Sequence, residues 1–296
     1  MGGVLQRLIK CFAMIKDEVD IVEDWLRHTL DLFGAGNVYV LDNESTDGTE
    51  SILRHYRPHV WSESVKASVE GPSKGQLITS LMHEHKDECD VLVPIDGDEF
   101  IGLQNSWDRD AIIAEFERLD LRQYGRFKFT LNYDAIAAAD EDNFPVRSLN
   151  NFSVTSYEFF GDTYKDFAKV FYSAEPFIRS DNGNHFGESS HPSVQYTSLW
   201  LYHYSLRSLR QFEKKILNAA AYTNYWKTHR YSRHWKAAYE AYLEGRFREH
   251  YEAQLGRLRQ QRRMTWPAAR LRALDLDPRL PARVGPLEPI ADRVPD

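Results

Sequence analysis

Carboxylates follow two apolar runs of the chain. The run 38–41 ends at Asp42, and the run 91–95 ends at Asp96 and Asp98, which flank a glycine. An apolar run that stops abruptly at acidic residues is typical of a buried strand in an α/β sheet. Such sheets bind ligands at the carboxyl ends of their strands, and two aspartates one residue apart suit a hard divalent cation that carries a diphosphate. The pattern therefore predicts a site for a nucleotide-activated donor.

The first half of the chain alternates apolar segments of strand and helix type. Expected strands cover 8–15, 37–41, 59–62 and 90–95, and expected helices begin near Asp17, Glu50, Ser73 and Asp108. Strands separated by helices predict a mostly parallel sheet with helices on both faces. The expected class is therefore α/β, with a Rossmann-like sheet.

The second half has a different texture. Aromatic and β-branched runs at 126–131, 152–159, 167–172 and 198–204 predict further strands that cover one end of the sheet. The expected organisation is a nucleotide-binding and catalytic domain over 1–204, a helical extension over 205–265 and a tail over 266–296. Because the tail is rich in proline and arginine, we expect it to be weakly ordered and to add little packed core.

Composition narrows the class of protein. Of 296 residues, 42% are hydrophobic and 27% are charged, as in an ordinary soluble globular protein. The net charge of −7 does not indicate a nucleic-acid partner. Cys11 and Cys89 lack the spacing of a zinc site or a disulfide framework. No apolar run approaches the ~20 residues that span a bilayer, so the expected location is cytoplasmic.

Basic and aromatic residues gather in the expected helical extension. Such helices can lie on anionic lipid or hold a lipid-linked acceptor, which would place the protein peripherally at the inner face of a membrane. The alternative is a helical cap whose basic face is simply solvated.

Four blocks of sequence occur in a specific order. They are Met14–Glu18, Glu23–Trp25, Leu41–Thr49 and Asp96–Phe100. In this order they resemble a glycosyltransferase of the GT-A fold, similar to the family-2 group and especially to its family-92-like branch. The resemblance is strong over 8–100 and looser through Lys169, 184–185 and 203–208.

The resemblance implies a role for each matching residue. Asp42 would accept a hydrogen bond from the nucleotide base, and Asp98 would coordinate Mn²⁺ or Mg²⁺. Asp96 would contact the ribose or the metal. The full set of implied donor contacts is Ala13, Lys16, Glu18, Asp42, Asn43, Ser45, Asp47, Lys74 and Asp96.

Each of these roles has a simpler alternative. Asp42 could only cap its turn, and Lys16 and Glu18 could belong to a solvated helix start. His203 is the candidate third metal ligand, either as a ligand or as a structural histidine, and His185 is the competing choice.

The catalytic base is the least determined part of the site. Inverting transfer needs a carboxylate that takes the proton of the acceptor hydroxyl. Asp134, beyond the expected strand 126–131, and Glu188, between a glycine and a serine, are the candidates. A retaining outcome also stays open.

The expected function is metal-dependent transfer of a hexose from a UDP-sugar to a glycan or lipid-linked saccharide, in cell-surface polysaccharide synthesis. A sugar nucleotidyltransferase is one alternative, but the segment 12–18 lacks the glycine-rich, Arg/Lys-bearing loop that would hold a triphosphate. A non-catalytic module that binds nucleotide or carbohydrate is the other.

Overall fold

The computed structural model describes residues 7–68, 70–104, 106–135, 151–152, 154–155, 168–223, 233–259, 263–264 and 274–284. Its helices are α1 Val22–Phe33, α2 Thr49–Tyr56, α3 Lys74–His85, the 3₁₀ turn η1 Lys86–Glu88, α4 Arg109–Glu117, α6 Leu209–Thr223, α7 Arg233–Leu243 and α8 Phe247–Arg259. Its strands are β1 Ile9–Ile15, β2 Val38–Asp42, β3 Trp61–Ser64, β4 Val91–Pro94, β5 Glu99–Leu103, β6 Arg126–Ala135, β7 Asn151–Phe152, β8 Val154–Thr155, β9 Val170–Ser173, β10 Phe177–Arg179, β11 Glu188–Ser189, β12 Val194–Leu206 and β13 Arg263–Met264.

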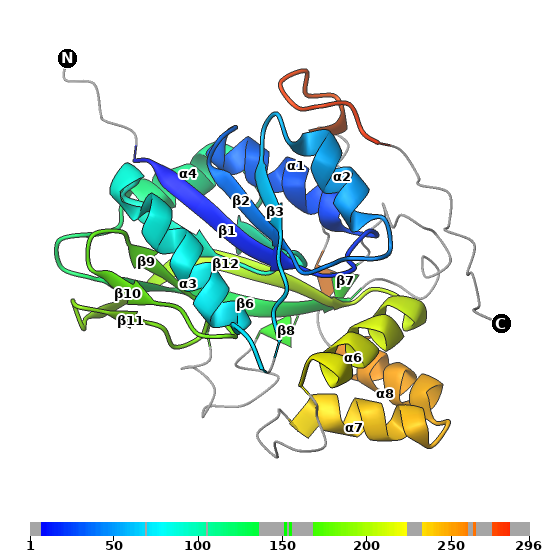
Figure 1. Ribbon diagram of the computed structural model, residues 1–296. Coiled ribbons are helices and arrows are strands. Elements are labelled where there is room, and N and C mark those ends of the chain that lie inside the picture. Colours follow the sequence, from blue (N-terminus) through cyan, green and yellow to red (C-terminus); the bar gives the residue numbers. More distant parts are fainter. Residues whose placement is uncertain are drawn as a thin grey trace.

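One large sheet runs through the molecule in the order β3-β2-β1-β4-β9-β6-β12-β5 (Figure 1). The pairs β3–β2, β2–β1 and β1–β4 are parallel, whereas β9 is antiparallel to both β4 and β6. β12 is parallel to β6 and antiparallel to β5, so parallel and antiparallel pairs both occur in this half of the sheet. The expected α/β class, a sheet with helices on both faces, is confirmed, but the sheet is mixed rather than mostly parallel.

Helices cover both faces of this sheet because successive side chains of a strand point to opposite faces. Cys11 and Ala13 of β1 lie in one apolar cluster with residues of α1, α2 and α4. Phe12, between them, lies in a second cluster with Ile78 and Met82 of α3. The alternation along β1 therefore buries both faces, as expected from the sequence.

The helical extension has an apolar cluster of its own. Phe212 and Ile216 of α6 pack with Ala238 of α7 and with Phe247 and Tyr251 of α8. These three helices lie at the end of the sheet where β12 finishes (Figure 1). The proposed division after residue 204 stays a prediction. Among the described helices, none is both long and apolar enough to cross a membrane.

The segment 274–284, which belongs to the expected tail, packs against the helices that cover the large sheet. For this segment the expectation of little packed core was wrong. Leu274 is buried in the same cluster as α1. The guanidinium of Arg27, itself buried, donates hydrogen bonds to the carbonyl oxygens of Leu274 and Pro281. Arg283 pairs with Asp24. The segment runs beside α1 and α2 (Figure 1).

Replacing Leu274 by alanine is expected to lower the free energy of unfolding by about 2–5 kcal/mol, because it removes buried methyl groups and leaves a cavity. Urea unfolding measures the effect. Leu276→Ala is the matched control, since Leu276 is 84% exposed, and it should change stability by no more than about 0.5 kcal/mol. Equal effects in both variants would contradict the packing of this segment.

Candidate active site

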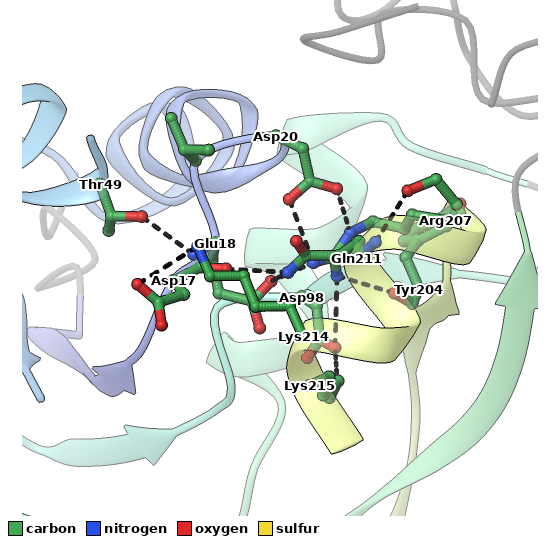
Figure 2. Close-up of polar contacts among 12 residues, drawn as sticks. Asp17, Glu18, Asp20, Thr49, Asp98, Tyr204, Arg207, Gln211, Lys214 and Lys215 are labelled. Carbon is green, nitrogen blue, oxygen red and sulfur yellow. Dashed lines mark hydrogen bonds and ion pairs between the residues drawn. The ribbon is translucent and has the colours of Figure 1, made fainter. Parts of the chain in front are cut away.

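The site forms where the carboxyl ends of three adjacent parallel strands meet. The turn after β1, the turn after β2 and the turn from β4 to β5 lie at this edge, because β1 pairs in parallel with both β2 and β4. The end of β12 and the first half of α6 approach the same edge: Figure 2 shows Arg207, which follows β12, together with Lys214 and Lys215 of α6. The two acidic stretches therefore lie at the same edge of the sheet.

The turns after β1 and β2 hold each other in place. The backbone N–H of Asp17 donates to Ser45 Oγ at 2.8 Å, and the backbone N–H of Thr46 donates to Asp17 Oδ1 at 2.7 Å. Asp17 has a φ of 55°, a left-handed conformation that aspartate tolerates better than most residues. Asp47 Oδ2 accepts from the backbone N–H of Val19 at 3.2 Å. Ser45 and Asp47 thus shape the turn itself.

Three other expected donor contacts lie in or beside this turn. Asp42 is buried, its Oδ1 accepts from the backbone N–H of Ser45 at 3.3 Å, and burial raises its pKa. Asn43 Oδ1 accepts from the backbone N–H of Ala67 at 2.9 Å. Lys16 Nζ donates to the carbonyl of Asn43 at 2.8 Å. Asp42 is the residue of this group whose carboxylate stands at the strand end.

Ala13 is placed differently from the other expected contacts. It lies within β1, paired with Val40, and its side chain is buried in the core. The structure therefore keeps the Ala13 side chain out of the site.

Two lysines neutralise Asp96. Lys74 Nζ pairs with Asp96 Oδ1, and Lys169 Nζ lies 3.0 Å from Asp96 Oδ2 and 3.0 Å from Glu99 Oε1. Burial alone would raise the pKa of Asp96, but the two ammonium groups outweigh it and hold that pKa well below its usual range. Asp96 therefore stays ionised at neutral pH.

The start of α3 positions Lys74. Ser73 accepts from the backbone N–H of Gln76, whose side chain accepts in return from the backbone N–H of Ser73. This capping box fixes where the helix begins. Gly75 then touches the turn at 181–186, since a Cβ there would lie 2.9 Å from the backbone nitrogen of Asn182. Only glycine allows this approach.

Three cationic or ionisable groups surround Asp98, which is itself buried. The distances to Asp98 Oδ2 are 3.3 Å from His203 Nε2 and 3.5 Å from Arg207 Nη1, and Lys215 Nζ pairs with the same oxygen. Burial opposes ionisation, but these neighbours hold the pKa of Asp98 well below its usual range. Of the two candidate histidines, His203 is therefore the one beside the carboxylate pair. His185 lies in the turn that contacts α3, where its backbone N–H donates to Asp181 Oδ1 at 2.8 Å.

Arg207 joins the acidic turn after β1 to Asp98. Its guanidinium donates to both oxygens of Asp20, at 2.7 and 3.2 Å, and pairs with Glu18 (Figure 2). Burial raises the pKa of Glu18 to about 7, since Asp98 and Asp20 add to the local negative charge while Arg207 offsets it only partly. Glu18 therefore serves this buried network, which the sequence did not reveal.

The two candidate bases lie in different places. Asp134 stands in register with Tyr204 of β12, whose backbone N–H donates to the carbonyl of Asp98 at 2.9 Å. The backbone of Asp134 is thus one strand away from the acidic pair.

Glu188 lies near the opposite end of β6. Arg126 Nη1, at the start of β6, donates to the carbonyl of Gly187 at 3.2 Å, whereas His203 pairs with Tyr133. From residue 126 to residue 133 a strand extends roughly 23 Å, at about 3.3 Å per residue. Glu188 is therefore too far from Asp98 to act as the catalytic base at this site.

The residues at Asp98 fit a divalent ion. No group of three or more His, Cys, Asp or Glu side chains with metal-holding geometry occurs within the described ranges. A magnesium ion in a diphosphate site nevertheless takes only one or two carboxylates, with phosphate and water completing its shell. Asp98 and His203, 3.3 Å apart, provide two ligands, and the ammonium of Lys215 already places a positive charge on the same oxygen.

Comparisons with known proteins give only distant likenesses. No protein-family model matches the chain, and no curated protein matches it. Among solved structures it is similar to TarS 1–349 of S. aureus in complex with UDP-GlcNAc, with 12% identity over 71% of this chain and a TM-score of 0.42. It is also similar to the mannosyltransferase PcManGT of Pyrobaculum calidifontis in complex with GDP-Man and Mn²⁺, with 18% identity over 43% of this chain and a TM-score of 0.30.

A third similar structure is a cytidylyltransferase from Leptospira borgpetersenii, with 11% identity over 42% of this chain and a TM-score of 0.27. The chain spans 66%, 36% and 54% of the lengths of these three proteins, respectively. The likenesses concern the fold only, and at these TM-scores they do not bear on the donor, the acceptor or the metal.

Proposed function

We propose that this chain is a metal-dependent glycosyltransferase that moves a hexose from a UDP-sugar to a glycan or lipid-linked saccharide. The observation that carries the proposal is the position of Asp42 and of the Asp96 and Asp98 pair at one edge of the sheet, on strands that flank β1. One rigid sheet edge thereby holds a carboxylate for the nucleotide base, Asp42, and a pair of carboxylates for the metal ion that carries the diphosphate.

In this proposal the chain binds the donor at two points. Asp42 accepts a hydrogen bond from the uracil, and Asn43, Ser45 and Asp47 shape the turn around it. The ammonium group of Lys74, at the start of α3, faces the phosphates from the side of Asp96. Two fixed points orient a flexible donor, which lowers the entropic part of the barrier.

Asp98 and His203 would hold the ion, and Asp96 would contact the ribose or a water on the ion. When bound, Mn²⁺ or Mg²⁺ supplies positive charge where the nucleoside diphosphate leaves. We assign the base to Asp134, because its backbone lies one strand from Asp98. Proton removal from the acceptor hydroxyl by a carboxylate goes with direct displacement and inversion.

The resemblance to GT-A glycosyltransferases and the basic residues of the helical extension support a proposal for the pathway and the location of the enzyme. We propose that the enzyme acts in cell-surface polysaccharide synthesis, in the cytoplasm, with α6, α7 and α8 resting on the inner face of the membrane. Electrostatic attraction to anionic lipid would supply that contact.

Calorimetry with a panel of nucleoside diphosphates and their sugars tests the donor site, first with Mn²⁺ and then with EDTA. The expected result is micromolar binding of UDP and UDP-hexoses that disappears with EDTA. Absence of nucleotide binding in both conditions would overturn the proposal. Binding of nucleoside triphosphates in preference to UDP would favour a nucleotidyltransferase, and binding without turnover on any saccharide acceptor would favour a binding module.

A further inference from the structure

The polar face of α6 forms one wall of the candidate site. Gln211, Lys214, Lys215 and Asn218 follow helical spacing and so lie on one side of the helix. Gln211 Nε2 donates to the carbonyl of Asp17, and Asn218 Nδ2 donates to Asp17 Oδ2, both at 2.8 Å. This face therefore holds Lys215 over the turn that carries Asp98 (Figure 2).

The lysines of the site differ in how firmly they are held. Lys169 is 4% exposed and spans two carboxylates, so it is a fixed part of the structure. Lys215 is 21% exposed, and its ammonium pairs with the single carboxylate of Asp98 rather than spanning two. Arg207 keeps a positive charge near Asp98 even when Lys215 leaves, because Asp20 binds it through both oxygens. Lys215 can therefore move without leaving Asp98 unpaired.

Lys215 and a divalent ion need the same oxygen. The ammonium pairs with Asp98 Oδ2, which is also the oxygen nearest to His203. A divalent ion that binds between Asp98 and His203 must displace the ammonium. A displaced ammonium on a four-carbon stem would be free to turn toward a diphosphate carried by that ion, where a point cation stabilises phosphate oxygens.

We propose that Lys215 couples the ion to the donor: it competes with the divalent ion for Asp98 and, once displaced, binds the donor diphosphate. This inference rests on the proposed function. The ion displaces Lys215 from Asp98, and the donor binds the displaced ammonium. Each ligand therefore raises the affinity for the other by the same factor.

Lys215→Met in the full chain tests the coupling by two readouts of opposite sign. Affinity for Mn²⁺ alone, measured by electron paramagnetic resonance of the free ion, should rise about tenfold, because the competing charge-assisted contact is gone. Affinity for UDP at saturating Mn²⁺, measured by calorimetry, should fall about tenfold, because a phosphate contact is gone. Lys215→Gln, which keeps a polar side chain, should repeat both shifts.

Lys214→Met is the control for the measurement of Mn²⁺ affinity in the absence of UDP. Lys214 lies on the same helix but pairs with Asp17 and Asp47, at 3.6 and 3.4 Å, so the affinity for Mn²⁺ alone should stay as in the wild type. If the wild type binds no UDP, the proposed function fails. If it binds UDP while the Lys215 variants leave both affinities unchanged, or shift both in one direction, only the coupling role fails.

Discussion

Replacing Asp98 by asparagine is expected to lower kcat/KM for sugar transfer by about 100-fold to 1000-fold, the usual cost of losing one preorganised electrostatic group. Asparagine has nearly the same shape but no charge. His203, Arg207 and Lys215 then surround a neutral side chain, and the site loses its principal ligand for a divalent ion. Binding of Mn²⁺ and metal-dependent binding of UDP should be lost together.

The measurement is steady-state transfer from a UDP-hexose, with calorimetry of UDP and Mn²⁺ on the same preparation. Circular dichroism establishes that the variant folds. Asp87→Asn, at an exposed position in η1, removes the same charge elsewhere and should leave transfer unchanged. Tight metal-dependent binding of UDP by Asp98→Asn would show that Asp98 is not the metal ligand.

The carboxylate side of the site could be predicted because local sequence determines it. Val91–Pro94 is buried throughout, and the acidic residues Asp96 and Asp98 follow within four residues of its end. Residues that directly follow a strand of an α/β sheet lie at its carboxyl end, and this is the edge of the sheet where ligands bind. The start of α3 at Ser73 could also be predicted, because a capping box spans only four residues and so depends on local sequence.

Lys74 was expected at the site from the resemblance, but the position of the two cations beside Asp98 could not be derived from the sequence. Lys215 and Arg207 are more than 100 residues from Asp98 along the chain. Their charge was visible within a basic run, but helical spacing says only which residues share a face. Which face meets Asp98 depends on how α6 packs after β12, through Leu206 and Phe212.

The segment 274–284 shows a limit of reasoning from composition. Its proline and arginine content predicts weak order, yet specific partners override that tendency. A buried guanidinium needs acceptors, and Arg27 finds them in the carbonyl groups of Leu274 and Pro281. Nothing in the local sequence of α1 indicates where those acceptors come from.

Replacing Arg207 by methionine is expected to lower the free energy of unfolding by about 3–5 kcal/mol, the usual cost of removing one partner from a buried ion pair. Arg207 is 1% exposed and is the shared partner of Glu18, Asp20 and Asp98. Methionine fills a similar volume, so the loss reflects charge and hydrogen bonding rather than a cavity. Urea unfolding at pH 7 measures it.

Two controls separate this network from ordinary surface pairs. Lys236→Met removes an ion pair with Glu240 in which both side chains are about half exposed, and such pairs contribute about 0–1 kcal/mol. Arg207→Lys keeps the charge but loses the planar fork that binds both oxygens of Asp20, so its stability should lie between those of the wild type and Arg207→Met.

The pH dependence gives the sharper test, because a packing defect would not titrate. Lys215, His203 and Arg207 together hold the pKa of Asp98 below its unfolded value. A carboxylate of this kind contributes stability above the unfolded pKa, and that contribution is lost as the pH falls through the folded pKa. Removing Arg207 raises the folded pKa values of both Asp98 and Glu18, so the difference in stability between wild type and Arg207→Met should be largest above pH 7, where both carboxyl groups are ionised. It should shrink as the pH falls through the folded pKa values of Glu18 and then of Asp98, because the unfolded-state pKa is the same in both proteins and cancels from the difference. A difference that stays constant over this range would assign the role of Arg207 to packing instead.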